Sequence, residues 1–388
     1  MKSYDYIVVG SGLAGGVIAR QIAEKMNKTV CILERRSHIA GNIFDYTDEK
    51  GIKVQKYGPH VIHTNSYKVY EFITRFCKPI PYRTKCEAVI NGVSTPSPFN
   101  FTTIDQFYSV DEAMELKKRL KKYYNKPSVT IVEMLECKDS KIHGFAKFLY
   151  DNDYKLYTAK QWDVSPSDID PSVLKRVPIV LSYDDAYFCD KYEFIPWDGF
   201  TKMFRSIIDH PNINIELNTD ALNSITFNEE KGKILYKGIE NKVIYTGAID
   251  ELFGYKYGFL PYRSLVFKYK HIRSDSYQNT AIVAYPQADG FTRVTEYIKM
   301  PFQDGHGWTS VVYEYPVKYN RDTVTGGEPY YPVNTEESQK IYLKYREYAE
   351  KYSNLILCGR LAEFKYYNMD QVILQALDVY RNLEADSD

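Results

Sequence analysis

The first thirty-six residues constrain the fold most strongly, because three closely spaced glycines lie between two apolar runs. Tyr6–Val9 is β-branched enough for a buried parallel strand, and Leu13–Met26 has the apolar spacing of a helix packed on that strand. Gly10 permits the tight turn, Gly12 lets backbone N–H groups approach a pyrophosphate, and Gly15 lets the helix pack closely. The pattern predicts a dinucleotide-binding βαβ unit with a diphosphate at the helix N-terminus.

The second strand of this unit is expected at Thr29–Leu33, and it ends at Glu34, nineteen residues after Gly15. A carboxylate there can accept hydrogen bonds from ribose hydroxyls. Two arginines, Arg35 and Arg36, follow directly and precede a small-residue turn that ends at Asn42. This turn is suited to a second phosphate-facing loop. The alternative is a glycine-rich turn in another kind of α/β domain. The order of strand, glycines, helix, strand and acidic residue favours the dinucleotide site, because such a turn alone would not require that order.

Composition limits what is attached to this unit. A chain of 388 residues exceeds the size at which one core keeps growing, so two or three subdomains are expected. Fifty basic and fifty acidic residues give no net charge, which argues against nucleic acid or an anionic membrane as the main partner. No run of eighteen apolar residues and no export signal are seen, and six scattered cysteines suit reduced thiols. We therefore expect a cytoplasmic protein without a membrane span.

Two histidines, His60 and His63, lie three residues apart in a Gly-Pro turn region, Tyr57–Thr64. The turn is expected close to the cofactor. No third ligand accompanies the pair, so the sequence predicts polar contacts and no metal site.

These segments resemble bacterial UDP-galactopyranose mutase, a family of flavoenzymes. The resemblance rests first on GSGLAG at 10–15, ERRSHIAGN at 34–42 and YGPHVIHT at 57–64. It continues over nearly the whole chain in YTAKQW at 157–162, KRVP at 175–178, YDDAYF at 183–188, GRL at 359–361 and MD at 369–370.

The resemblance implies an α/β fold in which a Rossmann-like FAD-binding domain carries an inserted helical domain and an antiparallel β-sheet domain. The FAD-binding domain is expected at 1–80, 195–250 and 335–388, and the sheet domain at 81–100 and 251–334. The helical domain is expected at 101–190 with a mobile substrate loop at 163–180. Its expected helices are Asp111–Tyr124, one that begins at Ser128, and Lys141–Leu149; a buried strand at Leu355–Gly359 and a helix at Gln371–Leu383, preceded by Asp370, close the first domain.

The resemblance also implies an activity, the interconversion of UDP-galactopyranose and UDP-galactofuranose on reduced FAD. In this family, flavin N5 attacks the anomeric carbon as UDP departs, and the resulting flavin–sugar adduct opens and recloses without net redox change. The product supplies galactofuranose for cell-surface polysaccharide. A homodimer is implied, with UDP-galactose as the small-molecule partner.

The resemblance assigns roles to residues at both ends of the substrate. Tyr157 stacks on uracil and Trp162 lines the cleft, while Arg176 and Arg293 hold the pyrophosphate. The other substrate-binding candidates are Tyr187, Glu314, Tyr331 (chosen over Tyr330) and Tyr366. His63, Arg176 and Arg293 are the catalytic candidates beside the flavin nucleophile. The cofactor-binding candidates are Gly10, Gly12, Leu13, Gly15, Glu34, Arg35, Asn42, His60, Val61, Arg360, Met369 and Asp370.

Several alternatives stay open at the level of the sequence. The aromatic candidates could be ordinary core residues, and Glu314 could be a surface carboxylate of a sheet. The whole chain could be an amine-oxidase-like FAD-dependent oxidoreductase or a noncatalytic nucleotide-sugar binding protein, and a mutase could also accept UDP-N-acetylgalactosamine. Asn368 stands where the family has aspartate, so a role for charge at that position is in doubt.

Overall fold

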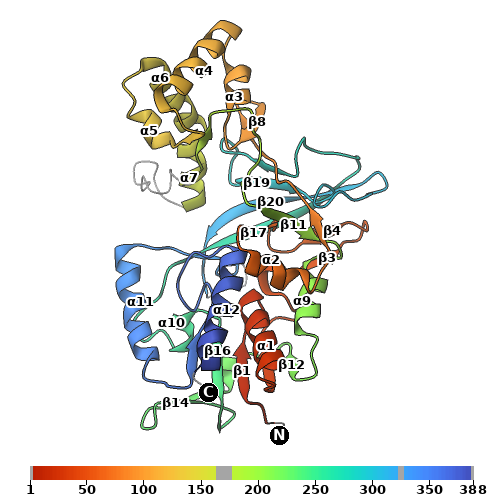
Figure 1. Cartoon of the computed structure of the whole chain (residues 1–388), viewed down its shortest axis with the longest axis vertical. Coiled ribbons are helices and arrows are strands. Elements are labelled where there is room, and N and C mark those ends of the chain that lie inside the picture. Colours follow the sequence, from red (N-terminus) through yellow and green to blue (C-terminus); the bar gives the residue numbers. More distant parts are fainter. Residues whose placement is uncertain (1–2, 163–176, 322–326, 386–388) are drawn as a thin grey trace.

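The computed structural model describes residues 3–162, 177–321 and 327–385. Its lower part in Figure 1 is built on a parallel five-stranded sheet in which the N-terminal strand is central. In spatial order the strands are β12 (Ile213–Glu216), β2 (Val30–Leu33), β1 (Tyr6–Val9), β16 (Lys242–Tyr245) and β22 (Leu355–Leu357). The central strands are almost wholly apolar and buried, as expected for a parallel sheet covered on both faces.

Helices cover one face of this sheet. Helix α1 starts directly after β1 and packs against the C-terminal helix, so segments from the two ends of the chain lie side by side (Figure 1). This face carries α1 (Leu13–Lys25), α2 (Tyr67–Thr74), α9 (Phe200–Ile208) and α12 (Met369–Ala385). Helix α12 begins earlier than predicted. The Asn368 carbonyl accepts from the Val372 N–H, and the Asn368 N–H donates to Gln371 Oε1.

The other face of the sheet packs against two helices and an antiparallel three-stranded sheet. These elements are α10 (Ile249–Leu252), α11 (Glu336–Ala349), β13 (Ile225–Asn228), β14 (Lys233–Tyr236) and β15 (Ile239–Glu240). Strand β22 was predicted to be buried, but it is half-buried because it lies at the edge of the parallel sheet, and it ends two residues earlier than expected.

A seven-stranded sheet lies in the middle of the molecule (Figure 1). Its strands pair antiparallel except for β18 with β7, which are parallel. In spatial order they are β21 (Tyr331–Pro332), β17 (Tyr262–Ile272), β20 (Thr309–Lys318), β19 (Arg293–Glu296), β18 (Ile282–Ala284), β7 (Cys86–Ile90) and β8 (Val93–Ser97).

A helical unit with its own apolar core forms the upper end of Figure 1. It contains α3 (Phe101–Phe107), α4 (Val110–Tyr124), α5 (Ile131–Leu135), α6 (Ser140–Leu149), a π-helical turn (Tyr150–Tyr154) and α7 (Lys155–Trp162). The helix predicted to begin at Ser128 begins at Ile131. Ser128 instead pairs with Val180, and Thr130 caps the helix in a reciprocal capping box with Glu133.

Short elements join these units. They are β3 (Asp45–Thr47) with β4 (Lys53–Gln55), β5 (Ile62–Thr64) with β11 (Tyr192–Pro196) and β6 (Pro79–Pro81), β9 (Ser128–Val129) with β10 (Ile179–Val180), and the 3₁₀ turns Gly41–Ile43 and Ala221–Asn223. Within the described residues, no helix combines the length and apolar character needed to cross a membrane.

Candidate functional site

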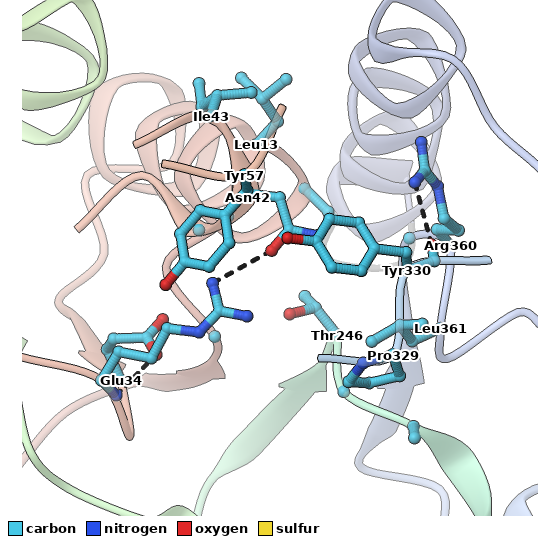
Figure 2. Close-up of a pocket in the computed structure, with 18 of the residues that line it drawn as sticks. Leu13, Glu34, Asn42, Ile43, Tyr57, Thr246, Pro329, Tyr330, Arg360 and Leu361 are labelled. Carbon is cyan, nitrogen blue, oxygen red and sulfur yellow. Dashed lines mark hydrogen bonds between the residues drawn. The ribbon is translucent and has the colours of Figure 1, made fainter. Parts of the chain in front are cut away.

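A cavity of about 260 Å³ opens at the carboxyl ends of β1, β2 and β16. This is the edge at which open α/β sheets bind ligands. In Figure 2, Glu34 and Tyr57 lie on one side of the cavity, Arg360 and Leu361 on the other, and the Tyr330 ring between them. Of the twelve predicted cofactor-binding residues, all of them described, nine line the wall: Gly10, Gly12, Leu13, Glu34, Arg35, Asn42, His60, Arg360 and Met369.

Two glycines of the β1–α1 turn, Gly10 and Gly12, and Gly15 in the first turn of α1 serve different purposes in the structure. Gly10 has φ +102°, and a Cβ atom at Gly15 would lie 2.1 Å from the Gly10 carbonyl oxygen. Gly15 therefore allows helix and strand to approach, although it does not itself line the cavity. A Cβ atom at Gly12 would meet no described atom within 4 Å and would project into open space. The turn thus leaves room for a ligand at the N-terminus of α1.

Glu34 is held in place before any ligand binds. One carboxylate oxygen accepts from the Ser11 backbone N–H at 2.8 Å and the Ser11 hydroxyl at 2.7 Å, and the other accepts from Arg36 N–H at 2.9 Å. A carboxylate has about four acceptor positions, so these donors leave about one for a ribose hydroxyl. The structure therefore gives Glu34 the orientation that the predicted role requires.

Charged groups beyond Glu34 tie the cavity wall to α10 and to the segment that precedes β21. Arg36 pairs with Glu328 at 2.8 Å, donates to Asn42 Oδ1 at 3.1 Å and lies over the Tyr57 ring. Arg35 pairs with Glu251 at 3.1 Å. Both arginines therefore form ion pairs with carboxylates. Arg36, which was not predicted as a cofactor-binding residue, lines the cavity as Arg35 does.

The two histidines are placed differently. His60 lines the cavity, and its Nδ1 lies 2.9 Å from the Gly58 carbonyl oxygen, the position of a donated hydrogen bond. Burial lowers the pKa of His60 to about 4, so the ring is neutral at pH 7. His63 lies off the wall, stacked on Phe188 at 3.7 Å with Nδ1 2.9 Å from Asp190 Oδ2. The structure therefore brings only His60 to the cavity.

The C-terminal candidates surround the opposite wall. Arg360 donates to the Tyr330 carbonyl at 3.0 Å and to the Tyr367 carbonyl, and it lies over the Tyr331 ring at 4.6 Å. Met369 lines the cavity at the start of α12. Two further predicted residues do not line the cavity. The Asp370 carboxylate accepts a hydrogen bond from the Thr64 hydroxyl at 3.1 Å, and Val61 is buried in the core beside His60.

Arg293 reaches the same cavity from the seven-stranded sheet. Its guanidinium donates to both carboxylate oxygens of Glu314, at 2.9 and 2.7 Å. Burial lowers the pKa of Arg293, but the Glu314 carboxylate and the Tyr157 phenol outweigh that effect and raise it well above its usual range. Glu314 is 2% exposed, so it is no surface carboxylate. The pair uses two of five guanidinium N–H groups and leaves the others for an anion.

Four predicted tyrosines gather around Arg293. Burial raises the pKa of Tyr157 to about 12, while Arg293 acts in the opposite direction, and burial also raises the pKa of Tyr187. Tyr331 stacks on Tyr366 with ring centroids 4.8 Å apart. Burial raises the pKa of Tyr331 as well, so the phenols of Tyr157, Tyr187 and Tyr331 are neutral hydrogen-bonding groups at pH 7. The structure brings them together with Arg293; Arg176 lies outside the described residues, as does the Trp162 side chain.

Asp153 is an ionisable group of this region that was not predicted. It lies in the π-helical turn, and burial raises its pKa to about 7, against the opposing effect of Lys160. Such turns are frequent at functional sites. Between pH 4 and 7 the carboxyl group is protonated in the folded protein and ionised in the unfolded chain. Wild-type stability therefore falls as pH rises through this range.

We expect Asp153→Asn to remove this pH dependence. A rise from 3.8 to about 7 corresponds to at most about 4 kcal/mol, at about 1.4 kcal/mol per factor of ten in proton affinity. Relative to wild type, the variant should gain stability between pH 4 and 8, measured by urea unfolding at several pH values. A stability difference that does not vary with pH would contradict the assignment.

Several lining residues were missed by sequence reasoning. Tyr57 and Tyr330 line the cavity, and Glu328 forms an ion pair with Arg36 of its wall. Their position beside predicted residues could have identified two of them, since Tyr330 precedes Tyr331 and Tyr57 is the first residue of the segment that contains His60 and His63. Nothing local marks Glu328, whose partner is far away in the chain.

Comparisons with known proteins agree with this arrangement. A family model described as UDP-galactopyranose mutase matches residues 153–366, and one described as NAD(P)-binding Rossmann-like domain matches residues 8–76. The chain is 34% identical over 379 residues to dTDP-fucopyranose mutase of Escherichia coli, with 96% of each covered. It is 35% identical over 384 residues to the probable UDP-galactopyranose mutase of Klebsiella pneumoniae, with 97% of this chain and 94% of the relative covered.

A solved structure of reduced UDP-galactopyranose mutase shares the fold, with a TM-score of 0.74, 16% identity and coverage of 99% of this chain and 94% of that one. Fold and cavity together define an α/β enzyme with a Rossmann-like dinucleotide-binding domain, whose cavity also reaches Arg293 of the seven-stranded sheet. The chain belongs to the UDP-galactopyranose mutase family, and its enzyme class is accordingly that of the isomerases.

Proposed function

We propose that the enzyme interconverts UDP-galactopyranose and UDP-galactofuranose with reduced FAD as its cofactor. One observation carries the proposal: Arg293, whose guanidinium donates only to Glu314 among the described residues, lines the same cavity as the glycine turn and Glu34. A dinucleotide at the turn and a nucleotide-sugar diphosphate at Arg293 would therefore share one cavity, with the sugar between them.

The residues of the wall fit FAD. The open space at Gly12 and the N-terminus of α1 suit its pyrophosphate, and Glu34 keeps an acceptor position for ribose. The cavity continues past His60 to Met369 and Arg360, which supports a cofactor longer than its adenosine half. When bound and reduced, the flavin supplies at N5 the electron pair that adds to the anomeric carbon.

The other contributions come from the protein. Arg293, held by Glu314, would stabilise the diphosphate as it leaves the sugar and retain it nearby for its return. Tyr331 and Tyr366 would donate hydrogen bonds to phosphate, with Tyr187, while Tyr157 stacks on uracil. His60 presents a neutral ring, so it adds no positive charge beside the cofactor. Arg176, Trp162 and the nine cofactor-binding candidates that line the cavity keep their predicted roles in this proposal. Gly15, Val61, Asp370 and His63 lie off the wall and would support it through packing and hydrogen bonds.

The biological setting is proposed on the same basis. We infer a cytoplasmic homodimer that supplies galactofuranose for cell-surface polysaccharide, and a chain divided at the predicted domain boundaries. The division is supported by the separate groupings of strands and by the largely separate apolar core of the helical unit, while the seven-stranded sheet shares a core with the parallel-sheet unit.

A second candidate is the interconversion of dTDP-fucopyranose and its furanose form. The observation that favours it is the 34% identity over nearly the full length to a dTDP-fucopyranose mutase. Both reactions need the same diphosphate clamp, and they differ in the base, the ribose 2′-hydroxyl and the substituent at sugar C6.

The test is to incubate the purified enzyme with UDP-galactofuranose or dTDP-fucofuranose, with and without dithionite, and to follow pyranose formation by chromatography. We expect conversion of UDP-galactofuranose mainly in the reduced sample, without stoichiometric consumption of reductant. Preferential conversion of the dTDP sugar would favour the second candidate. Failure with both sugars while flavin is bound would overturn both and favour another UDP-sugar, such as UDP-N-acetylgalactosamine, or an oxidoreductase.

A further inference from the structure

The Lys160 side chain joins the helical unit to the seven-stranded sheet. Its amine donates hydrogen bonds to the backbone carbonyls of Tyr285, Ala288 and Phe291, at 2.8, 2.7 and 3.0 Å. An ammonium group has three N–H donors, so these carbonyls use all of them. Burial lowers the pKa of Lys160, and the carboxylates of Asp289 and Asp153 act in the opposite direction.

The three carbonyls belong to the connection between β18 and β19, which ends immediately before Arg293. This connection is compact, because Tyr285 N–H donates to the Thr292 carbonyl at 2.8 Å and Ala288 N–H to the Tyr285 carbonyl at 3.2 Å. The carbonyls of residues 285, 288 and 291 therefore converge on one point. Lys160 occupies that point, and the start of β19 is fixed relative to it.

Lys160 also has a fixed relation to Tyr157, which lies three residues earlier in α7. Residues three apart are neighbours on the surface of a helix. Tyr157 in turn lies close enough to Arg293 and Glu314 for their charges to act on its phenol. In Figure 1, α7 is the helix of its unit that reaches toward the sheet containing β19 and β20.

We propose that Lys160 is a positioning residue that sets the separation between Tyr157, at the base end of the substrate, and Arg293, at the diphosphate end. The inference rests on the proposed function, which gives these two residues their ligands. Without the ammonium, three carbonyls lose their common donor and the connection before Arg293 relaxes. A ligand that spans both ends then binds less tightly, while a ligand that engages one end does not.

The experiment compares Lys160→Met with wild type in the full-length flavoprotein. Methionine keeps an unbranched side chain and removes all three donors. We expect UDP to bind about tenfold more weakly by titration calorimetry, and KM for UDP-galactofuranose to rise by a similar factor. The affinity of uridine, measured by its competition with UDP, should change less than about twofold.

The matched control is Lys155→Met on the same helix. Five residues correspond to about 1.4 turns, so Lys155 points to another face of α7, and its substitution should leave both affinities unchanged. Bound flavin and thermal unfolding show whether each variant is folded. Lys160→Arg keeps the charge and donors, and it should recover part of the UDP affinity; it also provides the comparison if the methionine variant does not fold.

Each outcome has a distinct meaning. An equal loss of affinity for UDP and for uridine in Lys160→Met would overturn the positioning role, because the substitution would then have weakened binding of the base alone. Unchanged UDP affinity in that variant, or arginine no better than methionine, would also overturn it. A wild-type protein that binds flavin but neither binds UDP nor converts either sugar would instead overturn the proposed function, and the inference with it.

Discussion

Replacing Gly12 with alanine should leave the fold intact and weaken cofactor binding, whereas the same change at Gly15 should disrupt the fold itself. A methyl group at Gly12 meets no described atom within 4 Å, but it occupies space where the pyrophosphate approaches the backbone. We expect FAD affinity to fall about 100-fold, or about 2.7 kcal/mol, and apoprotein stability to change by about 0.5 kcal/mol.

At Gly15 the added methyl group would lie 2.1 Å from a backbone oxygen and 3.1 Å from Val8 Cγ1. Neither the Gly10 carbonyl nor the packed Val8 side chain can move aside freely, so α1 must shift away from β1. We expect a loss of about 3 kcal/mol in the apoprotein, together with lost FAD binding. Urea unfolding of both apoproteins and FAD titration separate the two effects; equal destabilisation by the two substitutions would contradict this account of the turn.

The second large effect is expected at the Arg293–Glu314 pair. Arg293→Met leaves a carboxylate that is 2% exposed without its bidentate partner. We expect a loss of about 3–5 kcal/mol in unfolding free energy, measured by urea unfolding at pH 7, because an uncompensated buried charge is costly. Mutase activity should fall at least about 100-fold, since the proposed diphosphate clamp is lost as well.

The double variant Arg293→Met/Glu314→Gln separates stability from catalysis. Removing the carboxylate charge should restore most of the stability, because the buried group is then neutral. Activity should stay low, because the Arg293 cation of the proposed diphosphate clamp is still missing. A double variant as unstable as Arg293→Met would show that the pair does not carry the stability, and recovered activity would exclude Arg293 from the clamp.

The sequence predicted the parts of this molecule that depend on neighbouring residues. The β1–α1–β2 unit follows from apolar runs and glycines within thirty-odd residues, and the structure reproduces it almost to the residue. Boundaries were less accurate where a side chain decided them, as at Ser128, where a capping box at Thr130 moved the helix start.

Long-range contacts could not be predicted in this way. Glu314 was predicted as a substrate-binding residue, but its pairing with Arg293 depends on β19 and β20 lying side by side. The same applies to Lys160, whose three acceptors lie more than 120 residues away, and to Glu328 beside Arg36. Such contacts depend on tertiary packing and leave no local pattern.

The strand order of the parallel sheet has a consequence for biosynthesis. β22, at residues 355–357, pairs with β16 beside the N-terminal strand, and α12 packs on α1. During synthesis, the sheet and the helical layer around the first βαβ unit therefore cannot be completed until most of the chain has been translated. Pairings between segments so distant in sequence form slowly. We expect nascent chains that lack β22 and α12 to depend on chaperones and to acquire the cofactor only after synthesis has passed these elements.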